Sequence, residues 1–142
     1  MSSCRTDVKL LCFQAKRFRW KSHSKTLAEV EVETVVEEAL VAFLQVELKD
    51  GDDETRSRVF RHTLKHLKWL ANKRDLRRVV LHSFAHLGGQ NAPPSFASAL
   101  FQELSDRLES TGYEVHQTPF GYSCEWDLSV HGDSLAKVWK EI

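Results

Sequence analysis

The alternation of hydrophobic and polar positions near the start of the chain predicts two strands. Val8 to Gln14 is apolar enough for a buried strand. Lys16 to Lys21 alternates basic residues with Phe18 and Trp20, which is the period of two typical of a half-exposed strand. We expect these two strands to form a hairpin.

A third strand is predicted at Ala39 to Leu48, where an apolar run ends at the turn-rich segment Lys49 to Asp53. The segment before it, Ser22 to Glu38, carries valines at spacings that fit either a strand or a helix. Its structure stays open at the level of the sequence.

Two longer helices are predicted from apolar residues that recur every three or four positions. Asp53 can cap a helix from about Glu54 to Asn72. A second helix begins at Pro93 and Pro94, where prolines are tolerated, and stops near Gly112. The residues expected to face the core are Phe60, Leu64, Leu67 and Ala71 in the first helix, and Phe96, Leu100, Leu104 and Leu108 in the second.

Further strands are predicted on either side of the second helix. Arg77 to Phe84 has a continuous apolar centre, and Tyr113 to Gln117 and Tyr122 to Val130 read as two more strands. Ser134 is expected to cap a short final helix. The fold class predicted from this order is α/β, a single domain over residues 1–142 in which one mixed β-sheet is covered by the two longer helices.

Composition and charge narrow the function. The 142 residues are 42% hydrophobic and 28% charged, which describes one globular domain. No apolar run reaches the roughly 20 residues of a membrane helix, and the polar start lacks the apolar core of a signal peptide. Twenty basic and 20 acidic side chains give a net charge of zero, so the ligand is at most a short piece of RNA or a small molecule. Three cysteines without metal-type spacing favour a reduced, cytoplasmic setting.

Two residues are candidates for catalysis on their own chemistry. His86 follows a predicted strand and precedes two glycines, a place where a histidine can orient a water molecule or act as a general base. The alternative is a loop histidine that bonds a neighbouring carbonyl. Cys124 could be a nucleophile with His86 as its base, but burial as a small hydrophobic residue is favoured.

Two groups of basic side chains are candidates for ligand binding, one for a metal ion and one for RNA. His62 and His66 stand four apart, as two metal ligands on a helix would, but lysines and arginines surround them and no third ligand is evident. A solvated basic face is favoured, and no metal is expected. The candidate RNA contacts in the second predicted strand are Lys16, Arg17, Arg19 and Lys21, beside Phe18 and Trp20. An exposed hairpin whose aromatic residues cover the core edge is an equal alternative.

Two motifs carry a resemblance to a known family. Val79 to Leu87 and Thr118 to Tyr122 each read as a strand running into a tight turn, with a helix between them. In this order they resemble the serine-editing domain of archaeal threonyl-tRNA synthetases, and the similarity extends from Val8 to Ala136. The resemblance implies a D-aminoacyl-tRNA deacylase-like fold and hydrolysis of serine wrongly esterified to threonine tRNA. It implies the tRNA 3′ end as partner, a threonyl-tRNA synthetase as a second partner, and no cofactor.

The resemblance also implies which residues form the site. Those expected to line the substrate pocket are Val46, Phe84, Ala85, His86, Phe120, Gly121 and Tyr122. The chain departs from the family at Cys124, where the family has a lysine, and at Lys137, where it has an acidic residue. Lys137 is expected to reach the pocket from the final helix and, with His86, to serve catalysis. The alternative is a solvated lysine on an exposed face of that helix.

The leading function is therefore a free-standing editing hydrolase that deacylates mischarged tRNA in the cytoplasm. One alternative is a catalytically degenerate module that binds adenosine-bearing ligands, tRNA or a synthetase. A thiol hydrolase using Cys124 and His86 ranks third. A homodimer is an open alternative to a monomer.

Overall fold

The computed structural model describes residues 7–22, 33–47, 53–84, 94–118 and 124–142. The elements in chain order are β1 Val8–Ser22, β2 Glu33–Val46, α1 Asp53–Lys73, β3 Arg78–Ser83, α2 Pro94–Ser110, β4 Glu114–Gln117, β5 Cys124–Val130, the 3₁₀ turn η1 Ser134–Ala136, and β6 Lys137–Glu141. Both predicted helices and the central strands are present close to their expected bounds. Glu33 to Glu38, which the sequence left open, belong to β2.

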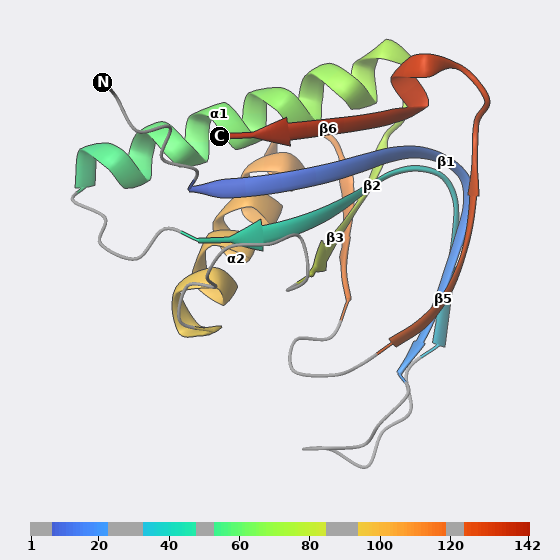
Figure 1. Cartoon of the computed structure of the whole chain (residues 1–142), viewed down its shortest axis with the longest axis horizontal. Helices are drawn as coiled ribbons and strands as arrows, with labels where there is room; N and C mark the ends of the chain where they lie inside the picture. Colours follow the sequence, from blue (N-terminus) through green and yellow to red (C-terminus); the bar gives the residue numbers. More distant parts are fainter. Residues whose placement is uncertain (1–6, 23–32, 48–52, 85–93, 119–123) are drawn as a thin grey trace.

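The strands form one mixed sheet in the order β4-β3-β2-β1-β5, with β6 paired to β1 as well. β2, β3 and β4 run parallel to one another, whereas β2, β5 and β6 are all antiparallel to β1. β5 pairs with the second half of β1 and β6 with its first half. The predicted mixed sheet with two longer helices is confirmed (Figure 1).

The two helices cover one face of the sheet, which we call the helix face. The expected apolar stripes lie there, with Leu67, Ala71, Leu104 and Leu108 fully buried against residues of β1, β2 and β3. The predicted helix stop is also present, since Gly112 follows α2 with a φ of 98° that favours glycine. Neither of the described helices is long and apolar enough to cross a membrane.

The opposite face, which we call the aromatic face, carries a second core built by strands alone. Its buried residues are Ala15, Phe18, Trp20, Val36, Ala39, Val41, Phe43 and Val80, with Leu11, Phe13, Phe84 and Leu128 packed against them. Phe43 lies at its centre, with its ring centroid 5.0 to 6.3 Å from the rings of Phe13, Phe18, His82, Phe84 and Trp126.

The predicted hairpin at the start of the chain is wrong, because Val8–Ser22 is one strand of 15 residues. The pairing of β1 with β5 shifts register between Ala15 and Arg17, so Lys16 is the extra residue of a β-bulge. Across from it, Glu38 has a φ of 47°. Figure 1 shows β1 and β2 bending sharply together, with β5 following β1. The polar break at Lys16 therefore bends the strand and does not reverse it.

The predicted final helix is also wrong. Ser134 opens a single 3₁₀ turn of three residues, preceded by Asp133 without a side-chain cap, and the chain continues as β6. β6 pairs with the first half of β1. Val138 of β6 also packs against the helix-face core. Backbone pairing and this burial favour a strand over an isolated helical turn.

Candidate functional site

The two family-like motifs leave the same edge of the sheet. Because β2, β3 and β4 are parallel, their carboxyl ends meet at one edge, where ligands bind in open α/β sheets. The Phe84 amide donates to the carbonyl of Leu44 at 2.9 Å, and the Thr118 amide donates to that of Leu81 at 3.1 Å. The segments that follow Phe84 and Thr118 thus begin on adjacent strands.

A buried hydrogen bond joins these two strand ends. His82 Nδ1 lies 2.7 Å from Thr118 Oγ1, and both side chains are buried. Burial lowers the pKa of His82 to about 4. The imidazole therefore stays neutral near pH 7 and holds the hydroxyl of Thr118 in place. Sequence reasoning missed this residue, although it lies two positions before Phe84 and so shares its face of the strand.

An apolar wall adjoins the strand ends on the aromatic face. Phe84 is half-buried and stacks on Phe43 with centroids 5.6 Å apart and an interplanar angle of 20°. Trp126 of β5 lies 5.4 Å from Phe43 and is 39% exposed. Exposed aromatic faces of this kind can stack on a flat ring such as a nucleobase.

Most residues expected to line the substrate pocket lie outside the described part of the chain, namely Ala85, His86, Phe120, Gly121 and Tyr122. A pocket between the two motifs stays a prediction. Val46 ends β2 at the same sheet edge, but its side chain is buried with the helix-face core.

Lys137 does not lie on a helix, so the reason given for its reach was wrong. It opens β6 opposite Phe13 of β1, and side chains paired in antiparallel strands lie on the same face of the sheet. Lys137 is thus on the aromatic face, exposed, and its Nζ donates to the carbonyl of His131 at 3.4 Å. Its catalytic role stays a prediction.

Cys12 and Cys124 lie on different strands, β1 and β5. Cys12 is fully buried, and burial raises the pKa of its thiol to about 12, which leaves it without nucleophilic thiolate at neutral pH. The backbone of Cys124 pairs with Ser22 at the start of β5. The side chain of Cys124 lies outside what the structure describes.

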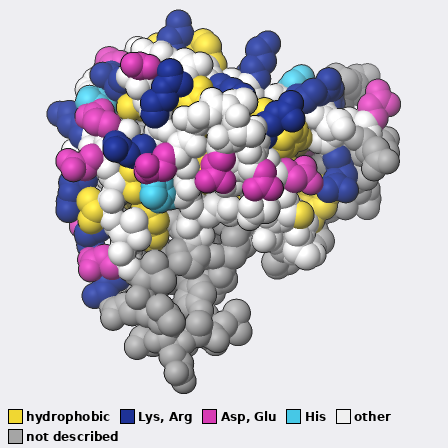
Figure 2. Space-filling view, turned by 180° about the vertical axis from the view of Figure 1, so that it is seen from behind, with side chains coloured by type: hydrophobic (Ala, Val, Ile, Leu, Met, Phe, Trp, Pro, Cys, Tyr) yellow, Lys and Arg dark blue, Asp and Glu magenta, His cyan; other side chains and the backbone are white. Residues whose placement is uncertain are grey.

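Three side chains in the basic segment of β1 are not placed as RNA binding would require. Phe18 and Trp20 are buried in the aromatic-face core, so they do not offer a surface for base stacking. Arg19 binds the carboxylates of Glu33, Glu125 and Asp127 at 2.8 to 2.9 Å, and these bonds raise its pKa. Arg19 therefore joins β1 to β5 and β2, while Lys16 and Arg17 are exposed. Figure 2 shows basic and acidic side chains interspersed over the face seen from behind.

The two helix histidines lie on α1, with His62 exposed and His66 half-buried. Within the described ranges, no group of three or more His, Cys, Asp or Glu side chains is placed to hold a metal ion. Both histidines instead line a pocket with Lys140 of β6.

Comparison with known proteins agrees with the motifs. Residues 8–142 match the family model described as the archaea-specific editing domain of threonyl-tRNA synthetase. The threonine–tRNA ligase of Hyperthermus butylicus is 30% identical over 140 residues, covering 92% of this chain and 22% of the ligase. That of Nitrosopumilus maritimus is 31% identical over 137 residues, covering 95% and 21%. The chain thus spans about a fifth of the length of these relatives.

A solved structure titled c-Myc DNA Unwinding Element Binding Protein is also similar, with a TM-score of 0.59 and 14% sequence identity. The match covers 94% of this chain and 98% of that one. At this identity the likeness shows the fold alone. It confirms the D-aminoacyl-tRNA deacylase-like fold expected from the sequence.

Proposed function

Because this chain belongs to the family of the archaea-specific editing domain of threonyl-tRNA synthetase, we propose that it edits tRNA by hydrolysing wrongly attached amino acids, with Ser-tRNA(Thr) as its first substrate. The observation that carries this proposal is the convergence of both motifs at one sheet edge, where the bond between His82 and Thr118 joins them. Free-standing action in the cytoplasm, on tRNA charged by a separate synthetase, is part of the proposal.

The reaction needs little acid–base chemistry, since an aminoacyl ester is already activated. A water oxygen adds to the ester carbonyl carbon, the bond from that carbon to the ribose oxygen breaks, and the ribose oxygen takes a proton. Positioning the water and stabilising the oxyanion supply most of the rate. His86 would orient the water. His82 serves as a positioning residue, because its partner is Thr118.

Selection between serine and threonine rests on one methyl group. A pocket that merely prefers a methyl gains only about 1–3 kcal/mol, whereas a tight wall can exclude it sterically. Phe84, half-buried at the end of β3 and stacked on Phe43, supplies a rigid surface for such a wall on the aromatic face.

The test is deacylation of a panel of mischarged tRNAs by the purified chain, with Ser-tRNA(Thr) first and Thr-tRNA(Thr) as the control. We expect serine to be released and threonine to be retained. Absence of turnover on every ester in the panel would refute the proposed hydrolase activity.

A second candidate function is favoured by the residues at Cys124 and Lys137, which differ from the lysine and the acid that the resemblance implies there. The domain would then bind the aminoacyl-adenosine end without hydrolysing it. Binding of a non-hydrolysable seryl-adenosine amide together with zero turnover would identify this module.

Replacing Cys124 with serine is expected to retain most deacylation activity, because the proposed reaction has no covalent enzyme intermediate. A nucleophilic thiol would give the opposite result, with nearly all turnover lost. Single-turnover deacylation of Ser-tRNA(Thr) measures the difference between the two mechanisms.

Replacing Lys137 with alanine is expected to lower ester hydrolysis at least tenfold, equivalent to about 1.4 kcal/mol of transition-state stabilisation. Lys137 lies on the aromatic face, where its ammonium could stabilise the developing oxyanion. The matched control is Arg107→Ala, which removes one positive charge from the end of α2. Equal rates for the two variants would remove Lys137 from the mechanism.

A further inference from the structure

We propose that a basic pocket between α1 and β6 binds backbone phosphates of the tRNA, away from the ester that is cleaved. This inference rests on the proposed function, because it assigns the body of the same substrate to a second surface. We call this surface the α1–β6 pocket.

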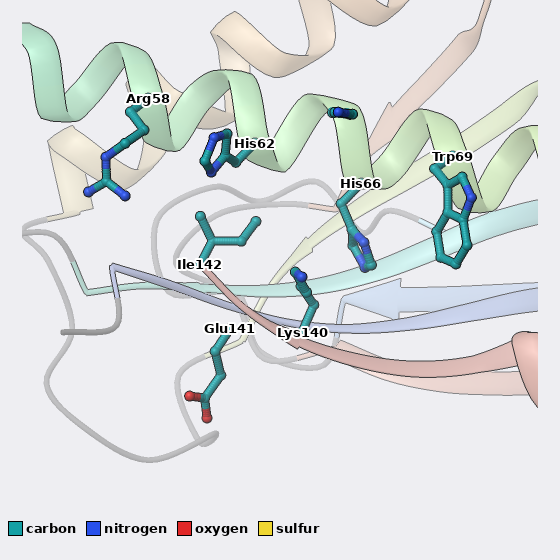
Figure 3. A pocket seen from close by; sticks show the side chains of 8 residues that line it. Arg58, His62, His66, Trp69, Lys140, Glu141 and Ile142 are labelled. Atoms are coloured by element: carbon teal, nitrogen blue, oxygen red, sulfur yellow. The ribbon is translucent and has the colours of Figure 1, made fainter. Parts of the chain in front are cut away.

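The α1–β6 pocket has a volume of about 560 Å³. Its lining residues are Arg58, His62, Lys65, His66 and Trp69 of α1, and Lys140, Glu141 and Ile142 from the end of the chain. The five residues of α1 follow the spacing of one helix face. Figure 3 shows the side chains of His66 and Trp69 directed from α1 towards β6, with Lys140 directed back towards His66.

The side chains that line the pocket carry more positive than negative charge. Arg58, Lys65 and Lys140 supply three cations, and the two histidines add polar nitrogens. Arg58 is partly balanced by Asp7, whose Oδ2 lies 3.5 Å from its Nη2. Glu141 lines the rim, but alternation along β6 puts it on the face opposite Lys140, and Figure 3 shows it directed away from α1.

His66 lies at the centre of this group, where its ring neighbours that of Trp69. Its Nε2 is buried and accepts or donates no hydrogen bond within the described residues. Burial and the nearby Lys140 lower the pKa of His66, so its ring is neutral at pH 7. A neutral imidazole between cations can donate a hydrogen bond to a phosphate oxygen, which would satisfy the buried nitrogen.

The length and position of the pocket favour an RNA backbone over a single phosphate. Eleven helical steps from Arg58 to Trp69 span about 16 Å, which is longer than one phosphate group. Trp69 is 46% exposed beside His66, with ring centroids 6.1 Å apart, so a ribose or base could pack on it.

One end of the α1–β6 pocket adjoins the sheet edge that carries the candidate site. At its Arg58 end, Ile142 accepts hydrogen bonds from the amides of Asp7 and Val8, and Val8 pairs with Val46 at the carboxyl end of β2. A tRNA with its 3′ end at that sheet edge could therefore lay its backbone along the α1–β6 pocket.

The test compares two double variants by fluorescence anisotropy with a labelled, uncharged tRNA(Thr) transcript over a series of KCl concentrations. Lys65→Ala/Lys140→Ala removes two charges from the pocket. Arg61→Ala/Arg107→Ala removes two charges outside it, from exposed positions of α1 and α2. We expect the pocket variant to raise the Kd at least tenfold and to lower the salt slope by about 1–2. The control should change the Kd less than threefold.

Equal Kd values for the two double variants would overturn the proposal. So would displacement of tRNA from the wild-type protein by millimolar inorganic phosphate beyond the effect of KCl at equal ionic strength, since that marks a free-phosphate site. A seryl ester of the 3′-terminal trinucleotide lacks the body of the tRNA, so the pocket variant should lose less activity on this ester than on Ser-tRNA(Thr). If the wild-type protein hydrolyses no ester, the proposed function fails while the anisotropy result still decides the pocket.

Discussion

Replacing Phe43 with alanine is expected to destabilise the domain by about 3–5 kcal/mol, the usual cost of emptying a buried phenylalanine site. Phe43 is 3% exposed, and its ring lies against five other aromatic rings of the aromatic face. Since no helix of the described chain contributes to that core, the surrounding strands have few side chains with which to fill the cavity. Urea unfolding, followed by circular dichroism, measures the loss.

The same substitution separates stability from function when Phe101→Ala is the control. Phe101 of α2 is 1% exposed in the helix-face core, so its removal should cost a similar free energy. Only Phe43 supports Phe84 at the candidate site, through the stacked contact at 5.6 Å. We expect deacylation per folded molecule to fall for Phe43→Ala and to persist for Phe101→Ala. If Phe43→Ala leaves no folded protein, Phe43→Leu keeps the core filled and still removes the stacked ring.

An unchanged unfolding midpoint for Phe43→Ala would mean that the aromatic face does not act as a core. Equal specific activity of the Phe43 and Phe101 variants would show that Phe84, which Phe43 supports, does not contribute to substrate binding.

The parts of the fold that the sequence predicted well depend on local pattern. The stripes ending in Ala71 and Leu108 repeat at the helical period, and Asp53, Pro94 and Gly112 mark helix ends. The strand before Phe84 has a short continuous run of buried apolar residues, Val79 to Leu81, which is typical of a parallel strand covered on both faces. Order and type of these elements lead directly to the mixed sheet.

The errors concern choices that depend on distant partners. A polar residue such as Lys16 between two apolar segments fits a turn as well as a bulge, and only pairing with β5 decides for the bulge. Likewise, Lys137 to Glu141 is too short for its pattern to distinguish helix from strand. It becomes a strand because β1 offers an edge more than 120 positions earlier in the chain.

The same limit applies to the candidate site. The basic run around Arg19 suggested RNA binding, but its three carboxylate partners come from β2 and β5. In the other direction, Lys140 carried no signal of its own, because the α1–β6 pocket forms only when β6 meets α1. His82 carried a partial signal through its place in the motif strand, whereas its partner Thr118 lies 36 residues away.

Lowering the pH from 6.5 to 4 is expected to destabilise the domain through His82 by about 3 kcal/mol. Burial lowers the pKa of His82 in the folded state from 6.5 to about 4. Between these values the unfolded chain binds a proton that the folded protein does not, so stability falls as the pH falls. Well above pH 6.5 both states are neutral at His82 and its contribution no longer changes with pH.

The difference between wild type and His82→Gln isolates this effect in urea unfolding at a series of pH values. His66, whose pKa is also lowered, and the carboxyls of Glu114 and Asp133 contribute equally to both proteins and cancel. Glutamine keeps a hydrogen-bonding group beside Thr118 but cannot be protonated. We expect the wild type to lose stability relative to His82→Gln as the pH drops below 6.5.

Thr118→Val identifies the cause of the pH dependence. Desolvation lowers the pKa of His82, and valine leaves that burial intact while removing the hydroxyl. This variant should therefore keep the steep loss of stability between pH 6.5 and 4 and should lower deacylation at pH 7, where the bond joins the two motif strands. A flat difference between wild type and His82→Gln over that range would show that the imidazole is solvated. The hydrogen bond between His82 and Thr118 would then not be a contact of a buried, neutral imidazole beneath the candidate site.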